Sequence, residues 1–130
     1  MLNFAICDDS LSIINQLTNL FENLFFKHDY PAKVLFTTTK ANDLLSYVSN
    51  NKIDVLVLDI NLHSNIDGLG VAKKIREFDK DCYIIFTTAH MEFAPVAYKY
   101  KTFDYISKPI NSQRIEETLF RLFNDIKRCY

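Results

Sequence analysis

The chain has 130 residues, of which 48% are apolar and 24% are charged, a composition typical of one globular domain and unlike that of a disordered segment. Its formal net charge of −1 argues against direct nucleic-acid binding, which requires a concentrated positive field. No apolar run approaches the ~20 residues of a membrane-spanning helix, and the N-terminus lacks the features of a signal peptide. We therefore expect one domain over residues 1–130, in the cytoplasm and without membrane contact.

Five short apolar runs predict strands. The third run contains VLVL between two aspartates, and an almost wholly apolar run of this kind is typical of a parallel strand covered on both faces. In chain order, the runs are Leu2 to Cys7, Lys33 to Thr37, Ile53 to Leu58, Cys82 to Thr87 and Phe103 to Ser107.

The segments between and after these runs carry apolar residues at helical spacing, which predicts five helices. Pro95 is accepted in a first helical turn but not in a helix interior, so the fourth helix is expected to begin near Phe93 or to be irregular before it. The apolar faces comprise Leu17, Leu20, Phe21, Leu24 and Phe25; Ala41, Leu44, Leu45 and Val48; Val71, Ala72, Ile75 and Phe78; Phe93, Val96, Ala97 and Tyr100; and Ile115, Leu119, Leu122, Phe123 and Ile126.

Strand and helix alternate along the whole chain, which predicts right-handed βαβ units. The expected fold is therefore α/β, a doubly wound, five-stranded parallel sheet with five helices on its two faces. Ligands of such sheets bind beyond the C-terminal ends of the strands, so functional side chains are expected there.

Cysteine and histidine give no sign of a metal site or a disulfide framework. Cys7 and Cys82 lie in apolar runs and are expected to fill the core, whereas Cys129 is expected to be an exposed thiol. The histidines, His28, His63 and His90, are scattered and expected at the surface.

Polar side chains follow the predicted strands. Asp8 and Asp9 come after the first, Asp59 after the third, Thr87 and Thr88 at the end of the fourth, and Lys108 after the fifth. Each has a simpler explanation when taken alone, as a turn former, helix cap, strand residue or solvated side chain. Their convergence on one edge of the sheet favours a functional site.

The chemistry of this set is consistent with phosphoryl transfer. Clustered carboxylates repel one another unless a cation joins them, and hard oxygen ligands without His or Cys suit Mg²⁺. A metal ion and an ammonium group can neutralise the phosphoryl oxygens while an aspartate oxygen attacks. Aspartate is a competent nucleophile for forming an acyl phosphate.

The chain resembles the receiver domain of two-component response regulators over essentially its whole length. The resemblance rests on the acidic pair in ICDD, the central aspartate in LVLDINL, the hydroxyl in FTTAH, and the aromatic residue and Lys-Pro in FDYISKP. It implies a flavodoxin-like receiver fold with strand order 2-1-3-4-5 and one receiver domain over residues 1–130.

The resemblance also implies roles for the acidic side. Asp59 would be the phosphoacceptor. Asp9 would ligate Mg²⁺ directly, and Asp8 would bind it directly or through water. Asn61 would supply its backbone carbonyl to the metal.

On the opposite side, Thr88 would be the switch hydroxyl, and it matches better than Thr87 because a small residue follows it. Lys108 would bond a phosphoryl oxygen and would be joined to Pro109 by a cis peptide, an isomer that X-Pro bonds tolerate. Tyr105 would be the aromatic residue that turns inward when Thr88 moves toward the phosphoryl group.

The chain departs from the family pattern beside Asp59. The segment to Asp67-Gly68 has one residue more than in the commonest receivers, and no proline follows Asn61, which predicts a bulge in the loop LHSNIDG. This loop, IIFTTAH and YKYKTFDYISKP resemble the receivers of regulators with LytTR-type DNA-binding domains.

The implied function is to take a phosphoryl group from a sensor histidine kinase, which docks near the first helix. The surface formed by the fourth helix, fifth strand and fifth helix would then change and control a DNA-binding output domain outside this chain. The same surface could form a homodimer. The domain would not be an enzyme beyond its own phosphorylation and dephosphorylation. The alternatives are a stand-alone or degenerate receiver that mediates protein contacts, or a Mg²⁺-dependent hydrolase; such hydrolases usually carry a second acid where this chain has Asn61.

Overall fold

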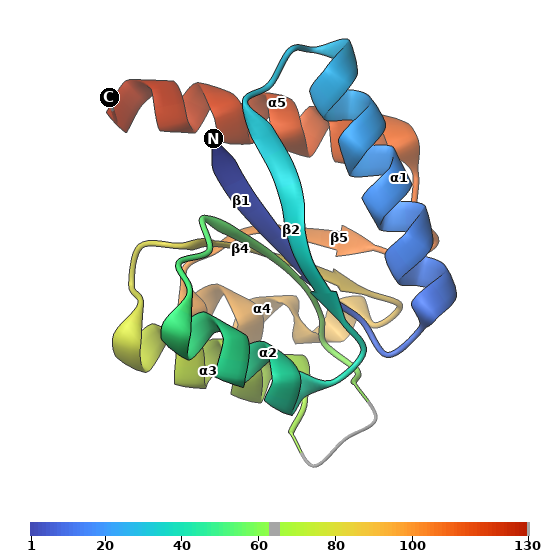
Figure 1. Ribbon diagram of the computed structural model, residues 1–130. Coiled ribbons are helices and arrows are strands. Elements are labelled where there is room, and N and C mark those ends of the chain that lie inside the picture. Colours follow the sequence, from blue (N-terminus) through green and yellow to red (C-terminus); the bar gives the residue numbers. More distant parts are fainter. Residues whose placement is uncertain (63–65, 130) are drawn as a thin grey trace.

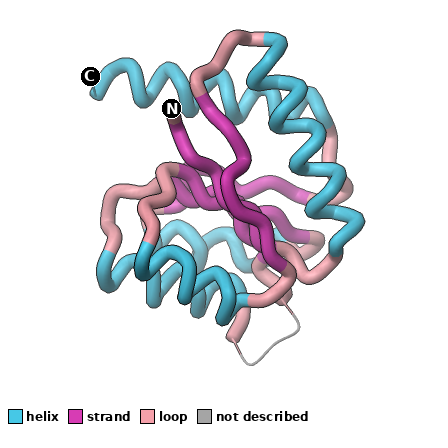
Figure 2. The backbone as a smooth tube through the Cα atoms, viewed as in Figure 1, coloured by secondary structure: helices cyan, strands magenta, loops and turns pink. Residues whose placement is uncertain are grey.

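The computed structural model describes residues 1–62 and 66–129, which form a parallel sheet between two layers of helices (Figure 1). Helices α1 and α5 cover one face, and α2, α3 and α4 cover the other (Figures 1 and 2). In chain order, the elements are β1 (Leu2–Cys7), α1 (Leu11–Lys27), β2 (Ala32–Thr38), α2 (Ala41–Asn50), β3 (Val55–Asp59), α3 (Gly68–Phe78), β4 (Tyr83–Thr88), the 3-10 turn η1 (Met91–Phe93), α4 (Ala94–Ala97), the 3-10 turn η2 (Tyr98–Tyr100), β5 (Thr102–Ser107) and α5 (Ser112–Cys129).

The strand order is β2-β1-β3-β4-β5, and every neighbouring pair is parallel. The predicted fold class and strand order are therefore confirmed. Strand β1 has its predicted bounds, and the other strands differ from theirs by one or two residues at an end. Ile53 and Cys82 precede β3 and β4 rather than starting them, yet both are buried, so their apolar character reflects core packing and not strand pairing.

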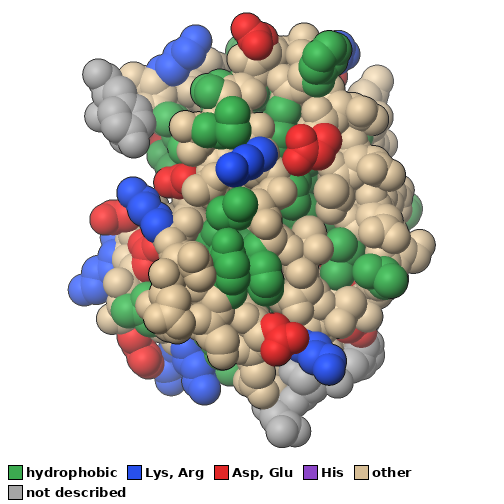
Figure 3. Space-filling model, viewed as in Figure 1, with side chains coloured by type: hydrophobic (Ala, Val, Ile, Leu, Met, Phe, Trp, Pro, Cys, Tyr) green, Lys and Arg blue, Asp and Glu red, His purple; other side chains and the backbone are tan. Residues whose placement is uncertain are grey.

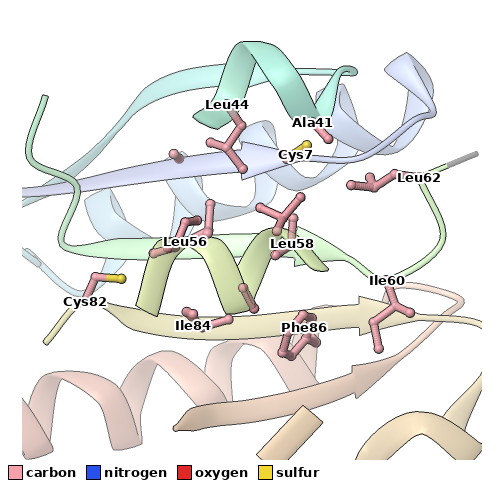
Figure 4. Close-up of a cluster of buried hydrophobic side chains, with 14 of the residues drawn as sticks. Cys7, Ala41, Leu44, Leu56, Leu58, Ile60, Leu62, Cys82, Ile84 and Phe86 are labelled. Atoms are coloured by element: carbon pink, nitrogen blue, oxygen red, sulfur yellow. The ribbon is translucent and has the colours of Figure 1, made fainter. Parts of the chain in front are cut away.

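Two apolar cores hold the layers together. Every residue of β3 is buried, as expected for a central parallel strand. Between the sheet and α2 and α3, Leu44 belongs to one buried cluster with Leu56, Leu58 and Phe86 (Figure 4). On the other face, the rings of Phe4, Phe21 and Phe25 form a cluster with centroids 4.8–6.0 Å apart. Cys7 and Cys82 are buried, as predicted, whereas the side chain of Cys129 and all of His63 lie outside the described residues.

The fourth helical segment is short and irregular, as the position of Pro95 led us to expect. Its α-helical part has four residues between two 3-10 turns, with Pro95 in the first turn, and it ends at Lys101 in a left-handed conformation with φ 57°. Its predicted apolar face is only partly correct, because Ala97 is buried while Phe93 and Val96 are exposed. Only a short helix lies against the sheet here, so few of its side chains reach the core.

The segment from β5 to α5 is fixed by a buried charge. The carboxylate of Asp104 accepts hydrogen bonds from both terminal nitrogens of Arg114 at 2.8 Å, from Arg121 at 2.6 Å and from the hydroxyl of Thr118 at 2.5 Å. Burial alone raises the pKa of Asp104, but the hydrogen bonds from Arg114 and Thr118 outweigh it and hold the pKa at about 2. The carboxylate is therefore ionised at neutral pH and ties α5 to the strand.

The surface carries charges of both signs. On the face shown in Figure 3, Lys and Arg side chains lie among Asp and Glu side chains, as a net charge of −1 leads one to expect. No helix within the described residues is both long and apolar enough to cross a membrane.

Truncating a buried leucine of α1 should cost far more stability than truncating an exposed one. Leu17 is fully buried and Leu11 is 63% exposed. We expect Leu17→Ala to lower the free energy of unfolding by about 2–5 kcal/mol, because it leaves a cavity against the sheet. Leu11→Ala should change it by less than about 1 kcal/mol. Urea unfolding followed by circular dichroism measures both, and equal losses would contradict the described packing of α1.

Candidate functional site

Three carboxylates converge where β1 and β3 end. These strands are parallel neighbours, so Asp8 and Asp9, which follow β1, lie at the same edge of the sheet as Asp59. One carboxylate oxygen from each of the three lies within 4.8 Å of the others. Asp8 and Asp59 are buried, whereas Asp9 is exposed to solvent. Such a group of hard oxygen donors has the chemistry that Mg²⁺ prefers.

Lys108 lies between the two buried carboxylates. Its ammonium nitrogen is 2.8 Å from Oδ2 of Asp8 and 3.4 Å from Oδ2 of Asp59. The other oxygen of Asp8 accepts a hydrogen bond from the amide of Ser10 at 2.9 Å, which orients the carboxylate. The backbone amide of Lys108 donates to the carbonyl of Thr88 at 2.8 Å. The Lys108–Pro109 peptide is cis, as the resemblance implied.

The crowding of charge shifts the pKa values of this site. Burial and the neighbouring charge of Asp8 raise the pKa of Asp59 to about 6, although Lys108 and the amide of Asn61 lower it. Burial lowers the pKa of Lys108, but the two carboxylates outweigh this effect and raise it above the usual value. Lys108 is therefore a cation at neutral pH, and Asp59 holds its proton more tightly than an ordinary aspartate. A second cation among the carboxylates would favour ionised Asp59.

The backbone after β3 is held in place beside the Asp59 side chain. The amide of Ile60 donates to the carbonyl of Thr87 at 3.3 Å, and the amide of Asn61 donates to Oδ1 of Asp59 at 3.2 Å. The amide of Asn61 therefore lies next to the Asp59 carboxylate, and the role of its carbonyl as a metal ligand stays a prediction. Within the loop LHSNIDG, where we predicted a bulge, residues 63–65 lie outside the described residues.

Thr88 and Tyr105 bond the same residue at the start of the fourth helical segment. The hydroxyl oxygen of Thr88 accepts a hydrogen bond from the amide of His90 at 3.0 Å, and the hydroxyl of Tyr105 donates to the carbonyl of His90 at 2.8 Å. Tyr105 is 4% exposed, and burial together with the charge of Glu92 raises its pKa to about 12. Tyr105 is thus buried here while the hydroxyl of Thr88 is bonded to His90.

The contribution of His90 was not predicted from the sequence. Its side chain is exposed, as predicted, but its backbone supplies partners for both Thr88 and Tyr105. Backbone contacts carry no signature of residue type, so the sequence held no signal for this role. Ser10 could have been found, because a serine before a helical pattern is a frequent N-cap; its hydroxyl accepts from the amide of Ile13 at 3.3 Å.

Neutralising Asp59 should stabilise the protein in a pH-dependent manner. Folding raises the pKa of Asp59 from 3.8 to about 6, so the folded state holds this proton more tightly than the unfolded state. The stability that the bound proton contributes is therefore lost as the pH rises through about 6. We expect Asp59→Asn to raise the free energy of unfolding by about 1–2 kcal/mol at pH 7.5 without Mg²⁺. The gain should vanish below about pH 4, where both states are protonated. Urea unfolding across this range measures it, with exposed Asp81→Asn as the control; a gain independent of pH would contradict the expectation.

Comparisons with known proteins agree with this geometry. Residues 4–120 match the sequence model of the response regulator receiver domain. The transcriptional regulatory protein YpdB of Escherichia coli K12 is 39% identical over 80 residues, which cover 62% of this chain and 32% of YpdB. The sensory transduction protein LytR of Staphylococcus saprophyticus is 37% identical over 119 residues, covering 90% of this chain and 44% of LytR. The chain thus spans less than half the length of these relatives. Their descriptions, as a transcriptional regulatory protein and a sensory transduction protein, agree with the resemblance to LytTR-type regulators.

A solved structure supports the same assignment. The crystal structure of the response regulatory domain of protein MrkE from Klebsiella pneumoniae superposes with a TM-score of 0.87 at 28% identity, over 98% of this chain and 99% of that one. The family match covers most of the chain, and the strand order is that of the receiver fold. The chain therefore belongs to the receiver domain family of two-component response regulators.

Proposed function

We propose that this receiver domain accepts a phosphoryl group on Asp59 with the help of Mg²⁺ and transmits the change through the surface of α4, β5 and α5. The observation that carries the proposal is the placement of three carboxylates, each with an oxygen within 4.8 Å of the others, beside the ammonium group of Lys108. This arrangement combines a nucleophile, a cation site and a counter-charge at one edge of the sheet.

The metal site consists of oxygen donors. Asp8, Asp9 and Asp59 would hold Mg²⁺ through their carboxylates, and Asn61 through its backbone carbonyl. Burial and, after it, the charge of Asp8 raise the pKa of Asp59, and a bound divalent cation would oppose both by favouring the ionised carboxylate. When bound, Mg²⁺ supplies positive charge opposite the phosphoryl oxygens.

The acceptor step uses Asp59 and Lys108. A carboxylate oxygen of ionised Asp59 forms a bond to the phosphorus of a phosphohistidine on the sensor kinase. The phosphorus–nitrogen bond breaks, and the electron pair stays on the imidazole. Lys108 is 18% exposed and already lies 3.4 Å from Asp59, so its ammonium group can bond a phosphoryl oxygen with little displacement.

The response passes through His90. A Thr88 hydroxyl drawn to the phosphoryl oxygens would release the amide of His90, to which it is bonded at 3.0 Å. Tyr105 holds the carbonyl of the same residue at 2.8 Å, so the local charge event reaches the start of η1. The two arrangements are then populations of one equilibrium that phosphorylation shifts.

The partners follow from this role. In the cytoplasm, a sensor histidine kinase supplies the phosphoryl group, and an output domain of the LytTR DNA-binding type receives the signal. A homodimer through α4, β5 and α5 is part of the proposal. A degenerate receiver fits less well, because Asp8, Asp9, Asp59 and Lys108 are all present and converge. A hydrolase is disfavoured by the amide side chain of Asn61 where a second acid is usual.

Incubation with acetyl phosphate and Mg²⁺ tests the acceptor role. We expect intact-mass spectra of the wild type to gain ~80 Da, the mass of one phosphoryl group, because Asp59 is placed for attack. Asp59→Asn and a sample with excess EDTA should show no adduct, whereas the exposed Asp81→Asn should behave as the wild type. A wild type without the adduct would refute the proposal, and multiple turnover of small phosphate esters would favour a hydrolase.

A further inference from the structure

Gly68 lies against the backbone of the proposed acceptor. It is the first residue of α3 and is buried, and its amide donates a hydrogen bond to the carbonyl of Ile60 at 2.7 Å. The contact joins the start of the helix to the residue that follows Asp59. It also ties together the two ends of the loop that is one residue longer than in the commonest receivers.

The position requires a residue without a side chain. A Cβ at Gly68 would overlap the carbonyl oxygen of Asp59 and would lie 2.7 Å from Cα of Ile60 and 2.9 Å from the carbonyl carbon of Asp59. All three are backbone atoms, so no side-chain rotation relieves the overlap. Neither glycine of the chain has a positive φ, so Gly68 is needed for space and not for backbone freedom.

The start of α3 cannot easily yield to such an overlap. The side chain of Asp67 caps the helix by accepting from the amide of Gly70 at 2.8 Å. Val71, Ala72 and Ile75 are almost fully buried and fix the helix on the sheet. An added methyl group would therefore displace the Asp59–Asn61 backbone, by roughly 1 Å before an ordinary contact is reached.

That backbone carries the groups used by the acceptor. The amide of Asn61 bonds Oδ1 of Asp59 at 3.2 Å, and the carbonyl of Asn61 is the proposed metal ligand. We propose that Gly68 is a positioning residue, which sets the Asp59 carboxylate and the Asn61 carbonyl by allowing α3 to begin in contact with the Asp59–Ile60 peptide. The inference rests on the proposed function and names a residue through which that site is built.

The two glycines of α3 provide a matched pair of variants. A Cβ at Gly70 meets Cγ1 and Cδ1 of the Ile66 side chain, at 2.7 Å and 3.2 Å, and these are side-chain atoms that can rotate away, not backbone. We expect Gly68→Ala to weaken Mg²⁺ binding at least about tenfold in isothermal titration calorimetry, and to slow adduct formation at saturating Mg²⁺ by about 10–100-fold. Gly70→Ala should stay within about threefold of the wild type in both measurements.

A folded Gly68→Ala that matches Gly70→Ala in Mg²⁺ affinity and in rate would overturn the positioning role. If neither the wild type nor Gly70→Ala forms an adduct, the acceptor function is refuted. The difference in Mg²⁺ affinity between the two glycine variants then still tests the positioning role of Gly68. If Gly68→Ala does not fold, hydrogen exchange of the Gly68 amide in the wild type tests the inference instead. The Gly68 amide should exchange at least about 100-fold more slowly than a free amide, and Mg²⁺ should shift its resonance together with that of Asn61. A Gly68 amide that exchanges freely or does not respond to Mg²⁺ would overturn the inference.

Discussion

The Lys108 ammonium between two buried carboxylates is the interaction on which the site depends. A parallel sheet brings the ends of β1 and β3 to one edge, and burial of Asp8 and Asp59 there creates a repulsion that the fold must offset. Lys108 offsets it from the end of β5, on the far side of β4. Lys108 offsets only part of the cost of ionising Asp59, because burial and the charge of Asp8 still raise the pKa of Asp59 to about 6.

The elements around this edge of the sheet differ in how firmly they are packed. β3 is buried along its whole length, and α5 is tied to β5 by the ionised Asp104. The segment from η1 to η2 contains only a short helix and exposes Phe93 and Val96, although Arg76 bonds the carbonyl of Tyr100 at its end. Under the proposed acceptor role, a change at Asp59 would therefore meet buried strands on most sides and this short, partly exposed segment on the side of His90.

Side-chain chemistry explains what the sequence could predict. Apolar runs located the strands, and the polar residues after them, such as Asp59 and Lys108, are brought together because parallel strands end at one edge. The misses have two causes. Phe78 and Val96 continue an apolar pattern but are exposed, since a pattern fixes the period of a helix and not how far the sheet beneath it extends. The close approach of Gly68 depends on two backbones, which no residue pattern describes.

The double attachment at His90 has a consequence for how this part of the surface can vary. Thr88 bonds its amide and Tyr105 bonds its carbonyl, and every residue except proline provides both groups. The His90 side chain is about half exposed, and its Nδ1 lies 3.3 Å from a carboxylate oxygen of Glu92. Contacts with the interior and contacts at the surface are thus made by different parts of a single residue. Substitution at this position can alter what the surface offers to other molecules while the connection to the interior stays the same.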